Sequence, residues 1–137
     1  MTLFIDSDIL LDAILLRVPY DDFAVKVLSL ADKKEYMLVA SAHSLLNVYY
    51  FTRKIANKEA ASKSLFLLQT KHHIADTTKS AVTSALRSDF ADMEDAVQHA
   101  VALENNCQII ITRNIKDYKK STIPVMTSEQ YLKTPKH

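Results

Sequence analysis

Short apolar runs alternate with longer amphipathic segments along the whole chain. The runs have the length and the branched apolar side chains of buried strands, and they occupy residues 3–5, 35–40, 72–75, 107–112 and 123–127. Segments with helical spacing of apolar residues lie between them, at about residues 8–16, 22–31, 42–56, 58–70, 77–86, 92–104 and 128–132. This alternation predicts an α/β protein of three layers, with a central parallel sheet of about five strands and helices on both faces.

Recognisable signals mark the ends of the predicted helices. Pro19 ends the first helix, and Ser41 and Asn57 are well placed to cap the third and the fourth. Asp76 is predicted to cap the helix that follows it. These boundaries leave no linker, and residues 133–137 are expected to form a loose tail.

Length and composition suit one domain, because 137 residues of which 48% are hydrophobic are enough to form a single packed core. We therefore expect residues 1–137 to form a single domain. The chain contains no glycine. Phosphate-binding loops of the P-loop type and dinucleotide-binding fingerprints are almost excluded, because both need glycine where the backbone approaches the phosphates.

Charge and cysteine content set the expected surroundings. The net charge is +1, so no strong overall field draws the chain to nucleic acid or to an anionic membrane, and nucleic-acid contact requires a local patch. Cys107 is the single cysteine, which fits a reducing compartment, and we interpret it as a core residue. No apolar run approaches the roughly 18 residues of a membrane span. We expect a cytoplasmic protein without membrane contact.

Acidic side chains occur at points that a parallel sheet brings to one edge. Asp6 follows the first strand, Asp92 and Asp95 begin the helix before the fourth strand, and Asn114 and Asp117 follow that strand. If the first and fourth strands are neighbours, these side chains meet at the carboxyl ends of both. Carboxylates held together raise one another's pKa unless a cation compensates, and Mg²⁺ or Mn²⁺ with oxygen ligands is the natural candidate.

Each acid also has a purely structural interpretation. Asp6 could cap the first helix, and Asp92 and Asp95 could stabilise a helix N-terminus through its macrodipole. Asp117 could be an exposed loop charge, and Asp8 either a helix-start charge or a partner that supports the site. The residues alone leave both interpretations open.

Other polar side chains lie in apolar surroundings. Asn47 belongs to a turn of helix that is apolar nearly all round, and a buried amide costs roughly 1 to 3 kcal/mol if left unsatisfied. We expect the Asn47 side chain to face a polar site, or else to bond a neighbouring backbone group. His43 and Ser44 are interpreted as structural. His72 and His73 alternate faces on a strand and cannot converge on one metal ion.

Three motifs resemble the PIN-domain family of metal-dependent ribonucleases, and the resemblance covers nearly the whole chain. FIDSDILLD resembles the family's opening strand with its first Asp, and DAVQHAVAL, preceded by DFADME, resembles the helix that begins with the central metal ligand. IIITRNIKDY resembles the strand and loop where the family commonly has Thr-Arg-Asp followed by Asp-Phe. RVPY and STIPVMTSEQYL resemble one branch of the family, the bacterial toxin components of VapC type.

The resemblance implies an enzyme that hydrolyses RNA phosphodiester bonds by metal-activated water, as the toxin component of a toxin–antitoxin pair. Asp6 and Asp95 would hold the main Mg²⁺ or Mn²⁺ ion. Asp117 would coordinate it directly or through water, and Asp92 would be an additional acid near the metal.

Two residues depart from the commonest family pattern. Asn47 and Asn114 stand where many members have Glu and Asp, although the branch named above often carries Asn at both places; they would orient ligands or the scissile phosphate. Each change removes a negative charge next to a cation, so we expect metal affinity to be lower. Thr112 and Arg113 are predicted to contact the substrate phosphate, in a segment from residue 113 to 135 with five basic and two acidic side chains, although this segment could also be an ordinary solvated loop.

Two other functions stay open. The chain could be a catalytically weak or inactive PIN-like protein that binds RNA or an antitoxin, or a haloacid-dehalogenase-type phosphatase with Asp6 and Asp8 as nucleophile and acid. The phosphatase would need glycine-rich turns that this sequence lacks. The apolar helices at residues 8–16 and 58–70 predict a homodimer seam or a groove for an antitoxin helix, unless core packing uses all of that surface.

Overall fold

The computed structural model describes residues 1–136, and within this range five strands form one sheet. They are β1 (Thr2–Ile5), β2 (Met37–Ser41), β3 (His73–Ala75), β4 (Ile109–Ile111) and β5 (Val125–Met126). All neighbouring strands are parallel and follow the order β3-β2-β1-β4-β5. The predicted parallel sheet of about five strands is confirmed, and β1 and β4 are neighbours at its centre.

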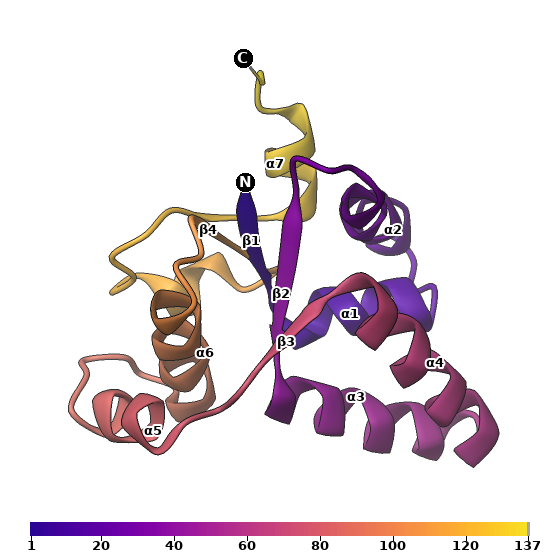
Figure 1. Cartoon of the computed structure of the whole chain (residues 1–137), viewed down its shortest axis with the longest axis horizontal. Coiled ribbons are helices and arrows are strands. Elements are labelled where there is room, and N and C mark those ends of the chain that lie inside the picture. Colours follow the sequence, from indigo (N-terminus) through magenta and orange to yellow (C-terminus); the bar gives the residue numbers. More distant parts are fainter. Residues whose placement is uncertain (137) are drawn as a thin grey trace.

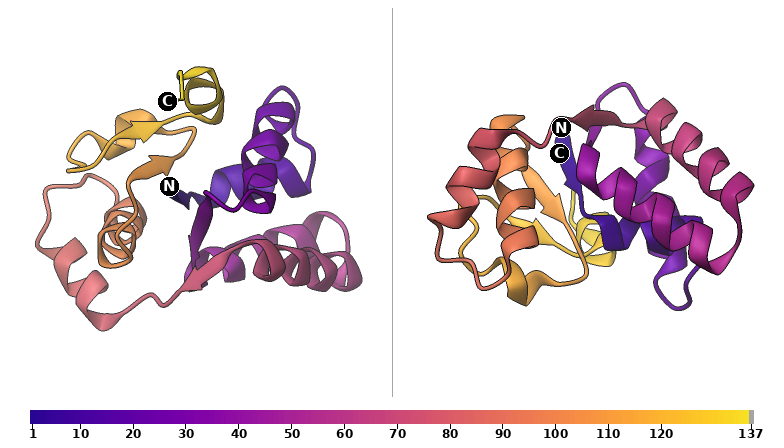
Figure 2. Two further views of the ribbon diagram at one scale, coloured as in Figure 1. Left: turned by 45° about the horizontal axis from the view of Figure 1, so that its top comes forward. Right: turned by 90° about the horizontal axis from the view of Figure 1, so that it is seen from below.

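Helices cover both faces of this sheet, as predicted. Within residues 1–136 they are α1 (Ser7–Ile14), α2 (Asp21–Leu28), α3 (Ala42–Ile55), α4 (Lys58–Lys71), α5 (Lys79–Leu86), α6 (Met93–Glu104) and α7 (Ser128–Lys133), with 3-10 turns η1 (Ser29–Asp32) and η2 (Ile115–Tyr118). Figure 1 shows α5 and α6 on one side of β1 and β2, and α1 to α4 on the other. The two views of Figure 2 agree, so the protein has three layers in the order α/β/α.

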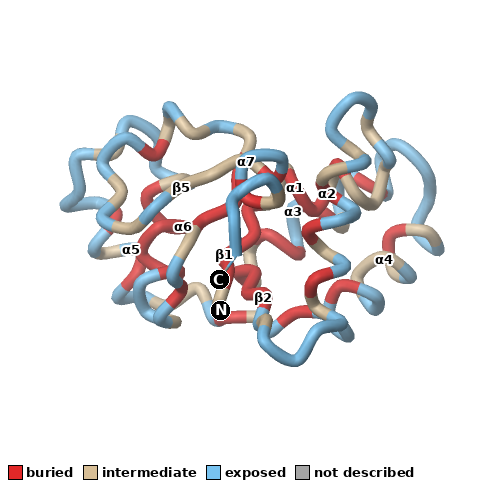
Figure 3. The backbone as a smooth tube through the Cα atoms, turned by 90° about the horizontal axis from the view of Figure 1, so that it is seen from above, coloured by how far each residue is buried: buried red, intermediate tan, exposed pale blue. Residues whose placement is uncertain are grey.

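The central strand β1 explains why the sheet is buried on both faces. Leu3 and Ile5 pack with the helical layer that contains α1, α2 and α4, whereas Phe4 packs with α5 and α6. All three side chains are fully buried, because successive residues of a strand point to opposite faces. Figure 3 shows buried backbone running through the middle of the molecule. No helix within residues 1–136 combines the length and the apolarity needed to cross a membrane.

The helix ends match the sequence signals with one exception. Ser41 and Asn57 cap α3 and α4, as predicted. The prediction for Asp76 is wrong, because Thr78 caps α5 and its hydroxyl accepts the backbone N–H of Ala81 at 2.9 Å. Thr78 directly precedes the first helical residue in extended conformation, whereas Asp76 lies too early in the chain to reach these donors.

The predicted loose tail lies only partly outside the folded core. Lys133 still belongs to α7, whereas residues 134–136 are exposed and follow the last helix. Position 137 lies outside the described residues.

Candidate functional site

Asp6 sits at the carboxyl end of β1 and is held by four donors. Its Oδ1 accepts the backbone N–H of Ser7 at 2.8 Å and the Gln98 amide at 3.1 Å. Its Oδ2 accepts the hydroxyls of Thr112 and Tyr118, both at 2.9 Å. Asp6 therefore caps α1 and also forms the buried centre of a polar cluster, since only 5% of the residue is exposed. The structural interpretation of Asp6 as the cap of α1 is confirmed, and its role as a metal ligand stays a prediction.

Gln98 connects three parts of the fold at this point. Its side chain is fully buried on α6, three residues after Asp95. Besides its bond to Asp6, its amide nitrogen donates to Ser44 Oγ at 2.7 Å, and its Oε1 accepts the hydroxyl of Ser41 at 2.7 Å. The start of α3, the first half of α6 and the end of β1 are thereby fixed relative to one another.

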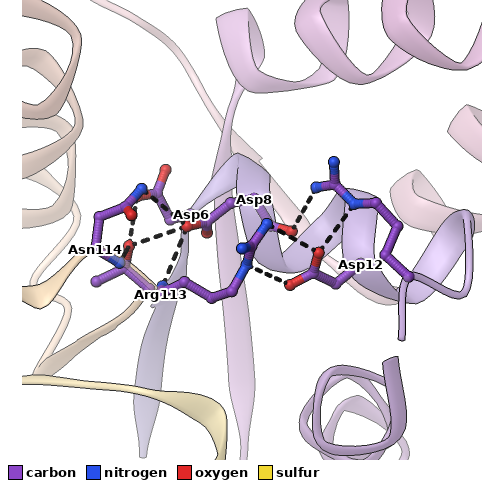
Figure 4. Close-up of polar contacts among 7 residues, drawn as sticks. Asp6, Asp8, Asp12, Arg113 and Asn114 are labelled. Atoms are coloured by element: carbon purple, nitrogen blue, oxygen red, sulfur yellow. Dashed lines mark hydrogen bonds and ion pairs between the residues drawn. The ribbon is translucent and has the colours of Figure 1, made fainter. Parts of the chain in front are cut away.

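Asp8 lies in the first turn of α1 and faces the loop after β4. Its Oδ2 accepts the backbone N–H of Arg113 at 3.1 Å and the Asn114 amide at 3.3 Å (Figure 4). Its other oxygen, Oδ1, is buried and has no hydrogen-bond partner within residues 1–136. Burial and the nearby charge of Asp6 raise the pKa of Asp8 to about 7.

A further acid, Asp12, is fully buried one turn beyond Asp8. It forms ion pairs with Arg17 Nε at 3.0 Å and with Arg113 Nε at 2.8 Å, and Figure 4 marks the contacts of Asp12 with dashed lines. The Arg113 guanidinium also lies over the Tyr20 ring, 4.0 Å from its centroid. Arg113 is therefore held on two sides, which fixes the backbone N–H that it offers to Asp8.

The first turn of α6 brings a second group of acids to this edge. Asp92 caps the helix by accepting the backbone N–H of Asp95 at 2.9 Å. Partial burial, together with the charges of Asp6, Asp92 and Asp117, raises the pKa of Asp95 to about 7. Burial and the charges of Asp6 and Asp92 also raise the pKa of Glu94. The acids that lie far apart in the sequence therefore act on one another electrostatically.

The donor set fits a hard divalent cation in its chemistry. The site offers carboxylate oxygens, one of them the unpartnered Oδ1 of Asp8, and mutual repulsion that a cation would relieve. Within residues 1–136, no three Asp, Glu, His or Cys side chains are arranged as a ready-made metal cage. Mg²⁺ keeps several waters and needs few protein ligands, so a site of this kind relies on water for the remaining positions.

Two predicted residues are not where the sequence interpretation placed them. Thr112 was expected to contact phosphate, but its side chain is fully buried and its hydroxyl donates to Asp6, so a phosphate contact of Thr112 stays an untested prediction. Asn47 was expected to be buried, but it is exposed, as are its neighbours Leu46 and Tyr50. Leu45 and Val48 on the same turns of α3 are buried, so only part of its apolar surface is open to solvent, and the role of Asn47 in the site stays a prediction.

Three residues of the cluster were missed from the sequence, although each carried a signal. Asp12 is a charge inside the apolar stretch LLDAILL, which is costly unless the charge is paired. Gln98 follows Asp95 by three residues and so shares its helix face. Tyr118 follows Asp117 directly, and burial and its bond to Asp6 raise its pKa.

The histidines have structural roles, as expected. His43 Nδ1 lies 2.7 Å from the hydroxyl of Thr77. His72 is buried against the carbonyl oxygen of Leu68 at 3.0 Å, whereas the adjacent His73 is exposed. The two side chains of this pair point to different surroundings.

The fold and the acids at the end of its central strand define the class of protein: a three-layer α/β domain whose functional edge is acidic. The family model described as "PIN domain" matches residues 2–116, and the chain belongs to the PIN domain family. Ribonuclease VapC1 of Aquifex aeolicus (strain VF5) is 24% identical over 132 residues, which cover 93% of this chain and 91% of that protein.

Several solved structures have the same fold. A chain of VapBC2 from Rickettsia felis, bound to a promoter DNA fragment, superposes with a TM-score of 0.70 at 20% identity, covering 92% of this chain and 97% of that chain. A chain of DNA-bound VapBC from Salmonella typhimurium superposes with a TM-score of 0.72 at 12% identity, covering 93% of this chain and 98% of that chain. A chain of a toxin–antitoxin complex from Klebsiella pneumoniae superposes with a TM-score of 0.67 at 23% identity, covering 93% of this chain and 98% of that chain.

Proposed function

We propose that this protein is a metal-dependent ribonuclease that hydrolyses RNA phosphodiester bonds and serves as the toxin of a toxin–antitoxin pair. The observation that carries the proposal is the acidic edge, where Asp8 and Asp95 both have a pKa of about 7 because burial and neighbouring carboxylates disfavour their charged forms. Family membership and the likeness to Ribonuclease VapC1 support this choice of activity.

In this proposal the carboxylates of the site bind the metal ion, and an amide orients the substrate. Asp6 and Asp95 would hold the metal, Mg²⁺ or Mn²⁺, with help from Asp117 and with Asp92 nearby. When bound, such an ion lowers the pKa of water and offsets charge on the phosphate. Asn114, which is exposed and bonded to Asp8, would orient the scissile phosphate.

Backbone phosphates of the RNA would meet the basic segment after β4. Lys116, Lys119 and Lys120 are exposed on and next to η2, which carries Asp117. Contacts of this kind bind any sequence and weaken with salt. Arg113 is paired with Asp12 through Nε at 2.8 Å and through Nη2 at 3.2 Å, so only the N–H groups that these two contacts leave over could bind a phosphate.

The experiment is cleavage of a labelled RNA with Mg²⁺ or Mn²⁺. We expect cleavage that stops on chelation and is absent in Asp95→Asn, but persists in Glu59→Gln, which removes the same charge from an exposed position on α4. Undiminished cleavage by Asp95→Asn would refute its role. Absence of cleavage by the unaltered chain with either ion would refute the proposed activity.

A binding protein without turnover is the second candidate. It is favoured by the absence of a three-residue cage within residues 1–136 and by amides at positions 47 and 114. Calorimetric titration with Mn²⁺ separates the candidates, because a chain that binds no ion at millimolar concentration cannot support the metal-dependent reaction.

An apolar groove of about 420 Å³ between α1, α2 and α4 is the proposed antitoxin site. Its apolar lining consists of Ala13, Ile14, Leu16, Val25, Leu28, Leu67 and Leu68. An amphipathic antitoxin helix is the proposed occupant, because the structures with this fold include toxin–antitoxin complexes. The alternative is a second copy of the chain, and light scattering that finds a monomer at high concentration would contradict the predicted homodimer.

A further inference from the structure

A second pocket, of about 540 Å³, adjoins the acidic site on the side of α2, η2 and α7. We call it the Tyr20 pocket; its walls include Tyr20, Phe23, Arg113, Asn114, Lys116 and Ser128. Its size falls in the range of small-ligand sites. Asn114 belongs to both places, since its side chain lines the pocket and its amide bonds Asp8 at 3.3 Å. A molecule bound at the acids would therefore extend naturally into the pocket.

The pocket contains a hydroxyl that the fold leaves unused. Ser128 is only 5% exposed, and its Oγ has no hydrogen-bond partner within residues 1–136. The neighbouring Thr127 hydroxyl is already engaged, because it caps α7 by accepting the Gln130 backbone N–H at 3.1 Å. Buried hydroxyls are nearly always paired in folded proteins. Ser128 thus offers a free donor and acceptor to a ligand in the pocket.

The walls of the pocket carry two acidic and two basic side chains, Asp12 and Glu129 with Arg113 and Lys116. Both acids are engaged in ion pairs, because Asp12 is shared by two arginines and Glu129 is paired with Lys133 at 2.5 Å. Lys116 is exposed and has no carboxylate within ion-pair distance among residues 1–136. Its ammonium group is therefore available to a phosphate.

The pocket also presents a flat surface. The Arg113 guanidinium is stacked over the Tyr20 ring at 4.0 Å, and Tyr20 remains 45% exposed. Proteins that bind single-stranded RNA stack its bases on aromatic rings and on arginine planes, and bond the base edges with polar side chains. A half-exposed aromatic ring beside a guanidinium, a hydroxyl without a partner within residues 1–136 and an unpaired lysine occur together here, which favours a nucleotide over an apolar peptide.

We propose that the Tyr20 pocket binds the nucleotide next to the cleaved phosphodiester, with its base against Tyr20, its edge read by Ser128 and its phosphate near Lys116. This inference rests on the proposed ribonuclease function. It adds a source of sequence preference that the acids themselves do not provide.

The test is the kinetics of Tyr20→Ala, Ser128→Ala and Lys116→Gln on single-stranded RNAs that differ in the nucleotide on either side of the cut. Tyr20→Ala should raise KM about tenfold, the usual effect of losing one stacked base, and leave kcat nearly unchanged, whereas Tyr20→Phe keeps the ring and should match the unaltered chain. Ser128→Ala should weaken the preference for one base at one flanking position.

Lys116→Gln should raise KM and make the dependence of log KM on log salt shallower by about 0.7, the value for one phosphate contact on a single strand. The matched controls are Tyr50→Ala and Lys63→Gln, which remove the same side chains from exposed positions on α3 and α4 and should leave KM unchanged. Thermal unfolding of each variant checks that it is folded.

Unchanged KM and unchanged base preference in all three variants, with cleavage intact, would overturn the pocket assignment and leave the pocket for a polypeptide segment. A fall in kcat without a rise in KM would overturn it as well. If the unaltered chain cuts no RNA, the proposed function has failed, and fluorescence anisotropy with a labelled RNA then tests the pocket separately. Equal RNA affinity of the unaltered chain and Tyr20→Ala would refute it.

Discussion

Replacing Gln98 by Leu tests whether buried hydrogen bonds hold the acidic edge together. The change keeps most of the volume but deletes three bonds, to Ser41, Ser44 and Asp6. Two are neutral bonds of about 1 kcal/mol each, and the bond to a carboxylate contributes about 2 kcal/mol. The contact of 2.8 Å between the two serine hydroxyls and the Ser7 bond to Asp6 remain, so part of this loss is offset. We expect the free energy of unfolding to fall by about 2–3 kcal/mol.

Urea unfolding measures this loss as a shift of the midpoint by about 1 M or more. The matched control is Gln69→Leu, which makes the same change at an exposed position of α4 and should alter stability by less than about 0.5 kcal/mol. Gln98→Glu adds a second test, because it places a carboxylate beside Asp6 and should be more destabilising at pH 8 than at pH 5. A loss below about 1 kcal/mol in Gln98→Leu, or no pH dependence in Gln98→Glu, would refute the reasoning.

Three other predictions concern groups that differ in burial and charge. Asp95 has a folded pKa of about 7 against an ordinary 3.8, so the metal-free chain loses stability as pH rises between these values. Asp95→Asn should therefore become more stable than the unaltered chain over that range, by about 1 kcal/mol at pH 8 after solvent screening. Equal urea midpoints of the two chains at pH 8 would contradict this. Asp12→Ala leaves two arginines unpaired and should lower the free energy of unfolding, measured in urea, by about 3–5 kcal/mol. The control Asp22→Ala breaks only an exposed ion pair and should lower it by less than about 0.5 kcal/mol. Similar losses in the two variants would contradict the burial argument. Cys107 is buried and its pKa is raised to about 12, so a thiol reagent at pH 8 should label it only after unfolding, and rapid labelling of the folded chain would exclude that environment.

The fold could be predicted because its signals are local and agree with one another. Apolar runs such as residues 3–5 and 109–111 are too short for helices, and the caps Ser41 and Asn57 mark where helices begin. Parallel strands separated by helices then permit few topologies. The prediction that Asp76 caps α5 was wrong because several residues that can cap a helix stand near its start, and the backbone conformation decides which of them does so.

That the acids gather at one edge could be predicted because each stands next to a strand or helix end. Asp6 and Asp95 follow that rule, and the charge of Asp6 contributes to the raised pKa of Asp95. Side-chain pairing across the molecule could not be predicted in the same way. Asp12 and Arg113 lie 101 residues apart, and Gln98 and Asp6 lie 92 apart, so nothing local announces either contact.

The sequence pattern led to a wrong expectation for the burial of Asn47 on α3. An apolar turn around Asn47 predicts a buried amide only if every apolar side chain enters the core. Leu46 and Tyr50 instead remain 58% and 62% exposed, which makes this surface available for another molecule. Sequence periodicity reports amphipathic character and does not distinguish a core face from a docking face.

The hydrogen bonds at the acidic edge are distributed unequally, and this bears on how a cation would be held. A carboxylate offers about four lone-pair positions, and the four donors to Asp6 occupy them. Direct coordination by Asp6 would therefore compete with a donor such as Tyr118, whereas Asp8 Oδ1 has no hydrogen-bond partner within residues 1–136 and Asp95 is repelled by four neighbouring acids. The electrostatic demand for a cation thus comes mainly from Asp8 and Asp95, while the donors around Asp6 fix the position of the edge on which they stand.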